Sequence, residues 1–224
     1  MMNIFRAWRS KAAIPRLSSV IAMSLLALSN GCALFKPVQA EEHYYLLTAK
    51  SLSYVATQGN GRACVVRLLP VEVPDYLQTE DMAVRIGTNQ IEFTVYHQWA
   101  EPLEAGIRRV IAENLRVSPQ IREVLTDEPS PRQEPVYEIS AHILACEGNY
   151  INGRGFITFG ATWEISQSGP QAATLAHGVY YAPLTNWHAG DYGELADQTS
   201  QVLNEFSQFL AHTVSEQAMA HSVR

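Results

Sequence analysis

The sequence predicts an α+β domain in which a mostly antiparallel sheet carries two amphipathic helices packed on one face. Two observations predict it. Several segments alternate apolar and polar residues, as half-buried strands do, and two other segments repeat their apolar residues at helical spacing. The chain runs through strands and then a helix, twice, and a single sheet covered by one layer of helices satisfies that order.

The first half of the domain is predicted to hold four strands and a helix. Residues 43–48 (HYYLLT) and 64–73 (CVVRLLPVEV) have strand composition, and Pro70 requires a bulge or a sheet edge because it lacks a backbone donor. Residues 82–86 and 91–96 form a predicted hairpin, with Ile91, Phe93 and Val95 on its half-buried face. Pro102 suits the first turn of the helix that follows, whose apolar stripe is Leu103, Ile107, Val110 and Ile111.

The second half is predicted to be an antiparallel meander followed by a long helix. Residues 137–143 alternate, Asn152-Gly153 provides turn chemistry, and residues 157–165 and 172–181 continue the pattern. The second helix is predicted over residues 191–214, with an apolar stripe of Tyr192, Leu195, Val202, Phe206, Phe209 and Leu210.

Residues 1–31 have the layout of a secretory signal. They carry four basic residues and no acidic one, followed by an apolar run at residues 20–28 and then small and polar residues. This run is shorter than the roughly 20 residues that a permanent membrane helix needs.

The signal can end at either of two places. Cys32 follows Gly31, which fits the small residue before a lipidated cysteine, although Ser29 stands where Leu is usual. The alternative is ordinary cleavage after Ala40, at the end of Val38-Gln39-Ala40. We expect lipidation at Cys32, because the other exit leaves a long polar tail. The predicted organisation is therefore a signal at 1–31, a lipidated tether at 32–42 and one domain at 43–224.

Removal of the signal makes the chain strongly acidic. Four of the 16 Lys and Arg residues precede Cys32 and none of the 22 Asp and Glu residues do, which leaves 12 against 22 and a net charge of −10. Such a surface repels phosphate backbones, so nucleic-acid binding is not expected. Attachment to a membrane would then depend on a lipid rather than on a basic patch.

Two further cysteines follow Cys32. Cys64 begins one predicted strand and Cys146 lies at the end of another. An even pair in an oxidising compartment is typical of a disulfide, and two separate buried thiols are the alternative.

The sequence contains few signs of catalysis. It has no G-x-S-x-G, no H-E-x-x-H, no phosphate-binding loop and no C-x-x-C, and its seven histidines are scattered. We therefore expect no enzymatic activity, no cofactor and no metal. A periplasmic, hydrolase-like enzyme whose residues converge only in space, and a binder of a small apolar ligand, remain as alternatives.

Several stretches together resemble the ABC-type transport auxiliary lipoproteins, in particular the paraquat-inducible PqiC-like lipoproteins. They are LPVEVPDYL at 69–77, NQIEFTVYHQWAEPLEAGIRRVIAENL at 89–115, and the strands around Asn152-Gly153 and Trp163. The resemblance extends from Tyr44 to the last helix, and its most specific parts are residues 73–77 and 99–103.

This resemblance implies a non-catalytic outer-membrane lipoprotein that faces the periplasm and contributes to envelope integrity. Its implied partners are a periplasmic MCE-domain (mammalian-cell-entry) protein and inner-membrane components that move lipids between the membranes. Ala33 is not the Asp that commonly retains lipoproteins in the inner membrane, which favours the outer one. Assembly of several copies stays open.

Large side chains in loops are candidate partner contacts, because aromatic residues are enriched at contact centres. The alternative is that Tyr76 and Trp99 pack under the sheet edge. The candidate residues are Pro74, Asp75, Tyr76, Leu77 and Trp99.

Overall fold

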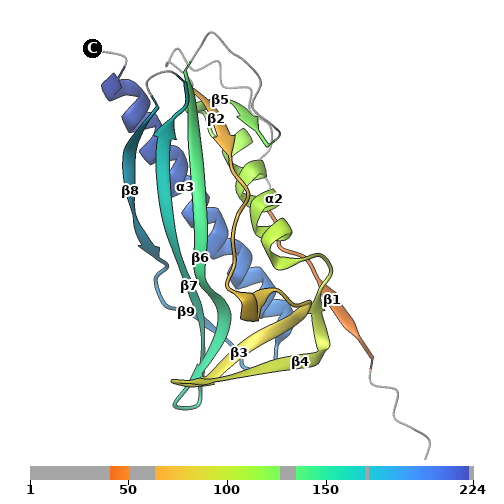
Figure 1. Ribbon diagram of the computed structural model, residues 1–224. Coiled ribbons are helices and arrows are strands. Elements are labelled where there is room, and N and C mark those ends of the chain that lie inside the picture. The colour runs from red at the N-terminus through yellow and green to blue at the C-terminus, as the bar shows by residue number, and fades with distance from the viewer. Residues whose placement is uncertain (1–40, 51–63, 127–134, 170–171, 222–224) are drawn as a thin grey trace, which may run out of the picture. The chain divides into compact units, whose positions relative to one another are not determined.

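A computed structural model describes residues 41–50, 64–126, 135–169 and 172–221. The predicted signal, Cys32 and most of the tether lie outside these residues. The described part of the compact unit Glu41–Arg224 contains two helices, a short 3-10 turn and nine strands (Figure 1). In chain order they are β1 (His43–Tyr45), β2 (Cys64–Leu68), η2 (Asp75–Leu77), β3 (Asp81–Gly87), β4 (Gln90–Trp99), α2 (Leu103–Arg116), β5 (Ile121–Leu125), β6 (Val136–Ile151), β7 (Arg154–Gln167), β8 (Ala173–Tyr181), β9 (Thr185–Trp187) and α3 (Tyr192–His221).

The predicted meander is confirmed as the antiparallel strands β6, β7 and β8. Asn152 and Gly153 turn the chain from β6 into β7 with φ values of 50° and 79°. Positive φ at both central residues is the geometry that Asn-Gly adopts most readily in a tight hairpin. The inward residues of β7 are buried as expected, apart from Trp163, which is partly buried; the others are Ile157, Phe159, Ala161 and Ile165.

The sheet is mixed, with the longer ladders antiparallel. One edge of β6 pairs with β7, and the opposite edge receives β2 and β3 in parallel. The strand predicted over 64–73 ends at Leu68, just before Pro70, and the chain returns to β6 through a single bridge from Glu72 to His142. The missing N–H of Pro70 explains the break.

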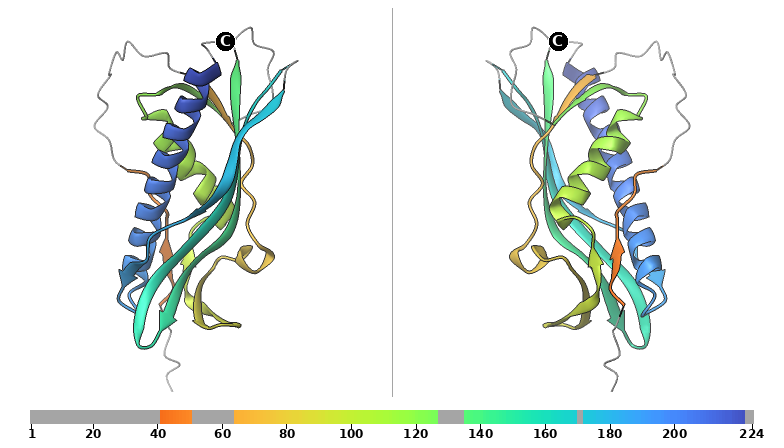
Figure 2. Two further views of the ribbon diagram at one scale, coloured as in Figure 1. Left: turned by 90° about the vertical axis from the view of Figure 1, so that its left-hand side faces the viewer. Right: turned by 90° about the vertical axis from the view of Figure 1, so that its right-hand side faces the viewer.

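Both helices cover the same face of the sheet, as predicted (Figure 2). The apolar stripe of α2 is fully buried, and Pro102 stands at its N-cap rather than inside its first turn. α3 continues to His221, beyond the predicted end at residue 214. Its rings join an aromatic cluster with the sheet, in which Phe206 lies 5.4 Å from Phe159 and 4.9 Å from Tyr180 between ring centroids.

The predicted hairpin of β3 and β4 is present, but the expected burial of β4 is wrong. Phe93 pairs with Ala83 and Gln98 pairs with Asp81, so Met82 alone faces the four residues 94–97. This bulge breaks the alternation of the strand. Phe93 is 44% exposed and Val95 68% exposed.

Within the described residues, no helix combines the length and the hydropathy that crossing a membrane requires.

Candidate functional site

A hydrolytic site needs either a metal ion or a nucleophile paired with a base. In the described ranges, no cluster of three or more His, Cys, Asp or Glu could hold a metal ion. Four histidine rings there have a polar side-chain partner, and each partner is a carboxylate or a phenol rather than a nucleophile. These pairs are His97–Tyr45, His142–Glu72, His188–Glu194 and His212–Glu216. None of these four rings is paired with a serine, threonine or cysteine side chain.

The two cysteines of the domain are free and buried, which corrects the disulfide interpretation. β2 and β6 do pair, but Val65 faces Val136, and Cys146 lies ten residues further along β6. Because Cys64 precedes Val65, the two cysteines are about eleven residue steps apart, which at about 3.3 Å per residue is roughly 35 Å. Burial raises the pKa of Cys64, and it raises the pKa of Cys146 to about 12. Both thiols are thus protonated and weakly nucleophilic at neutral pH.

The segment Pro74–Leu77 is fastened to the sheet by a buried carboxylate. The Tyr76 hydroxyl donates to Oε2 of Glu147 at 2.7 Å, and the Arg85 Nε donates to Oε1 at 2.5 Å. The Glu147 side chain has no exposed area. Burial, followed by the bond to the Glu147 carboxylate, raises the pKa of Tyr76. The network joins η2 to β3 and β6, and it leaves Asp75 as the exposed member of the segment.

Trp99 and Leu77 lie in the hydrophobic core, only 6% and 3% exposed. The backbone N–H of Trp99 donates to Glu80 at 2.7 Å, at the point where β4 ends and the chain turns into α2. Burial of these large apolar side chains stabilises the fold and withdraws them from the surface. The contact hypothesis therefore depends on Pro74, Asp75 and Tyr76.

The structure reveals an apolar surface that the sequence did not predict. β1 pairs in parallel with β4, with Tyr44 opposite Gln98, so Tyr44, Leu46 and Tyr96 share one face of this pair. They are 56%, 53% and 49% exposed, and Phe93 and Val95 extend the exposed apolar residues along β4. We call Tyr44, Leu46 and Tyr96 the tether-side surface, because β1 directly follows the predicted tether.

The opposite face of the same two strands carries a stack of rings. His97 lies between His43 and Tyr192, with centroids 5.2 Å and 4.2 Å away. The Tyr45 hydroxyl lies 2.9 Å from His97 Nδ1. Burial, and then the nearby His43, lower the pKa of His97. The stack attaches β1 and β4 to the start of α3.

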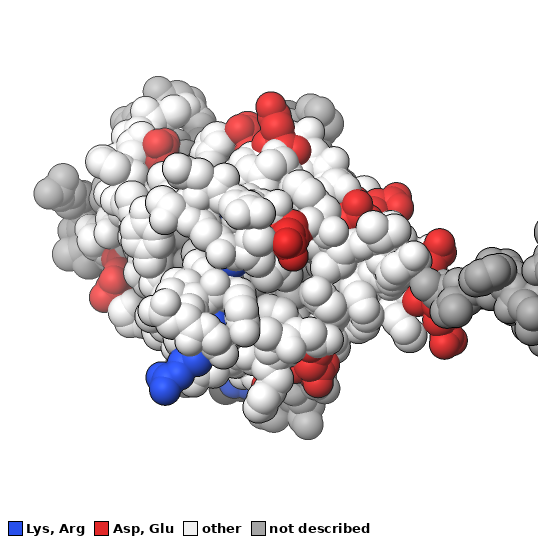
Figure 3. Space-filling model, turned by 90° about the horizontal axis from the view of Figure 1, so that it is seen from below, with Lys and Arg blue, Asp and Glu red and all other residues white. Residues whose placement is uncertain are grey.

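Acidic residues lie beside the tether-side surface. Glu42 accepts a hydrogen bond from the Tyr44 hydroxyl at 2.8 Å, and this bond, followed by the charges of Glu42 and Glu80, raises the pKa of Tyr44. Glu92 is exposed on β4 itself. Figure 3 shows this end of the domain as a mostly uncharged face, with acidic side chains dispersed over it and basic side chains at its lower left.

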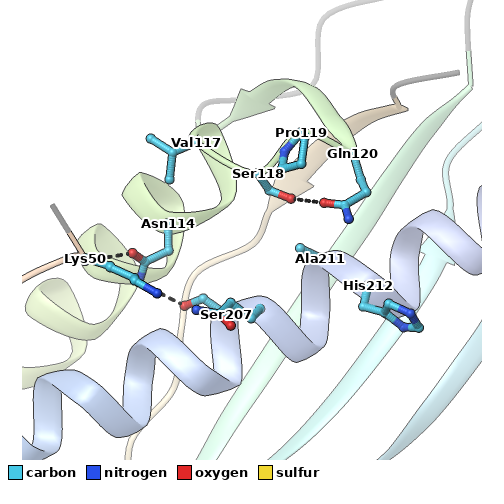
Figure 4. A pocket seen from close by; sticks show the side chains of 10 residues that line it. Lys50, Asn114, Val117, Ser118, Pro119, Gln120, Ser207, Ala211 and His212 are labelled. Atoms are coloured by element: carbon cyan, nitrogen blue, oxygen red, sulfur yellow. Dashed lines mark hydrogen bonds between the residues drawn. The ribbon is translucent and has the colours of Figure 1, made fainter. Parts of the chain in front are cut away.

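A cavity of about 360 Å³ lies between the end of α2 and the middle of α3 (Figure 4). Several of its polar side chains bond to one another or to backbone. Asn114 accepts from the Lys50 N–H at 3.0 Å and donates to Ser207 at 3.3 Å, while Ser118 donates to Gln120 at 2.5 Å. Small-molecule pockets are lined mainly by hydrophobic and aromatic side chains, whereas seven of the ten residues that line this cavity are polar. This cavity offers little to the apolar-ligand alternative.

The sequence carried one signal that could have revealed the tether-side surface. Residues 43–46 and 93–96 are both dense in aromatic and aliphatic side chains, more than strands with one solvent face require. The parallel pairing that brings the two segments together is non-local, and spacing alone does not show it.

By its structure alone, the chain is an α+β domain in which a mixed sheet carries two helices on one face. Comparison with known protein families then identifies the family of this chain. Residues 45–211 match the family described as ABC-type transport auxiliary lipoprotein component. The chain belongs to this family, which confirms the resemblance stated above. It is an auxiliary lipoprotein component of an ABC-type transport system, and membership implies a non-catalytic role.

Solved structures share the fold. Protein XCC0632 from Xanthomonas campestris, a DUF330 family member, superposes with a TM-score of 0.65 at 13% identity, over 81% of this chain and 99% of its own. A second, uncharacterized protein superposes with a TM-score of 0.59 at 18% identity, over 78% of this chain and 99% of its own. No curated protein matches this chain.

Proposed function

We propose that this chain is a non-catalytic accessory subunit of an MCE-type ABC system that moves lipids between the two membranes, and that it contributes to envelope integrity. Its partners are a periplasmic MCE-domain protein and the inner-membrane transport components. The match to the transport auxiliary family over residues 45–211 carries this proposal. That match spans the fold from the end of β1 into α3.

The proposed location is the periplasmic side of the outer membrane, with acyl groups on Cys32 as the anchor. A signal-like segment ends just before Cys32, and Ala33 follows it. Bacterial lipoproteins carry several acyl chains, and stable anchoring needs more than one. The net charge of −10 after signal removal leaves the domain without a basic route to a membrane.

The first experiment tests the anchor. Mass spectrometry of the protein from the membrane fraction should find an acylated N-terminal peptide that begins at Cys32, and Cys32→Ser should release the chain into the soluble periplasm. A mature chain that begins at Glu41 without acyl groups would refute lipidation. Fractionation of inner and outer membranes then tests the location.

The second experiment tests the partner. The chain should co-purify with an MCE-domain protein encoded beside it, and Asp75→Ala together with Pro74→Ala should weaken this without lowering stability. Asp197→Ala, which removes an exposed Asp on α3, is the matched control. If the folded double variant co-purifies with the MCE-domain protein as well as the parent chain does, the Pro74–Tyr76 segment is not the contact. Size-exclusion chromatography with light scattering would show whether several copies assemble.

A further inference from the structure

The tether-side surface is too apolar to be an ordinary part of a solvated face. Isolated exposed apolar residues are common, whereas contiguous ones mark a contact. Tyr44, Leu46 and Tyr96 lie on the same face of two paired strands, and all three side chains are about half exposed. Their burial against another surface would remove this apolar area from water.

The position of this surface limits what can cover it. The described unit begins at Glu41, three residues before Tyr44. Nine residue steps join Cys32 to Glu41, and a fully extended chain of that length spans at most about 30 Å. If Cys32 is acylated, as the proposed function holds, the tether-side surface is covalently confined to this distance from the bilayer.

The charges beside the tether-side surface distinguish three surfaces that could cover it: a second copy of the chain, an anionic bilayer and a zwitterionic bilayer. Glu42 and Glu80 lie beside Tyr44 in this surface. A symmetric contact with a second copy would bring these like charges together, which is unfavourable. An anionic bilayer would meet the same repulsion. A zwitterionic headgroup layer presents ammonium groups to the carboxylates, and tyrosine is enriched at membrane interfaces because its ring is apolar and its hydroxyl polar.

We propose that the tether-side surface rests on the zwitterionic phospholipid surface to which the lipid holds the chain. Tyr44 and Tyr96 lie at the level of the lipid headgroups with Leu46 beside them. The neighbouring acidic residues limit how deeply this surface enters the headgroup layer. The anchor and this contact together fix which end of the domain faces the membrane. The Asp75 segment and the open face of the sheet then remain available to periplasmic partners.

The test uses the full acylated protein, reconstituted in vesicles of phosphatidylethanolamine and phosphatidylcholine. Tyr96→Cys is labelled with an environment-sensitive dye, and quenching by a lipid-borne quencher is measured. Val179→Cys on β8 is the matched control, because Val179 is 54% exposed on a strand at the far side of the sheet. Cys64 and Cys146 are buried, so dye labelling of the parent chain, which lacks the introduced cysteine, measures the background.

We expect quenching at residue 96 to exceed that at residue 179 by about threefold or more, since interfacial side chains lie roughly 5–10 Å inside the headgroup boundary. Replacement of a third of the lipid by phosphatidylglycerol should reduce the difference. Equal quenching at both positions overturns the inference, as does protection of residue 96 that appears only after the MCE-domain partner is added. Failure of acylation at Cys32 would instead be seen by mass spectrometry and would refute the anchor itself.

Discussion

Tyr76→Phe tests whether the buried carboxylate of Glu147 holds the Pro74–Leu77 segment in place. The substitution keeps the ring and removes one hydroxyl. Oε2 of Glu147 then loses the donor that lies 2.7 Å away, while Oε1 keeps Arg85. Because the Glu147 side chain has no exposed area, water cannot simply replace the lost donor.

The magnitude follows from the charge of the acceptor. A hydrogen bond to a charged group contributes about 1.5–3 kcal/mol, so we expect the free energy of unfolding to fall by about 2 kcal/mol. In a domain of this size that corresponds to a drop in melting temperature of roughly 4–8 °C. Urea unfolding followed by circular dichroism measures the first quantity, and a thermal melt measures the second.

The control is Tyr181→Phe, which removes a hydroxyl from a ring that is 70% exposed and should change stability by less than about 0.5 kcal/mol. A double-mutant cycle with Glu147→Gln should return a coupling energy of about 1 kcal/mol or more. If Tyr76→Phe is as stable as the parent chain, the carboxylate does not hold the segment, and the assignment of the network is wrong.

Three further predictions concern the core, the ring stack and the thiols. Phe206→Ala removes a fully buried ring and should cost about 3–5 kcal/mol in urea unfolding; a cost under about 1 kcal/mol would contradict its burial. Because the pKa of His97 is lower in the folded chain than in the unfolded one, the unfolded chain becomes protonated at a higher pH. The contribution of neutral His97 to the free energy of unfolding is therefore complete above about pH 6.5 and is lost as the pH falls. His97→Gln should flatten that decline in melting temperature, and an unchanged profile would exclude His97 as its source. Cys64 and Cys146 should react with a thiol reagent only after unfolding, and fast labelling of the native chain would refute their burial.

Local periodicity predicted much of the fold because it reports which face of an element is buried. The stripe of α2 and the alternation of β7 are fixed by neighbours a few residues away, and the structure confirms both. β2 is different, since all five of its residues are buried. A strand covered on both faces shows no alternation, and its parallel pairing with β5 and β6 depends on contacts far away in the sequence.

The candidate contacts were harder to predict for a related reason. A large aromatic residue beside a turn has the same sequence signature whether it lies in the core, as Trp99 does, or on the surface, as Tyr96 does. The bulge in β4 decides the exposure of Val95 and Tyr96, and its register is set by packing against β3 rather than by the residues of β4 alone.

The attachment of β1 connects the anchor to the rest of the domain. β1 pairs with β4 over only three residues, too few to resist much displacement by themselves. The chain that follows it is held by side chains from both helices: the Thr48 N–H donates to Ser200, the Lys50 N–H donates to Asn114 and Asn204, and Arg109 donates to the Leu47 carbonyl. Because helix side chains bond directly to its backbone, this segment does not depend on a neighbouring strand. A pull transmitted through residues 41–43 therefore reaches α2 and α3 as well as the sheet edge, which suits a chain whose N-terminal side is its proposed link to a membrane.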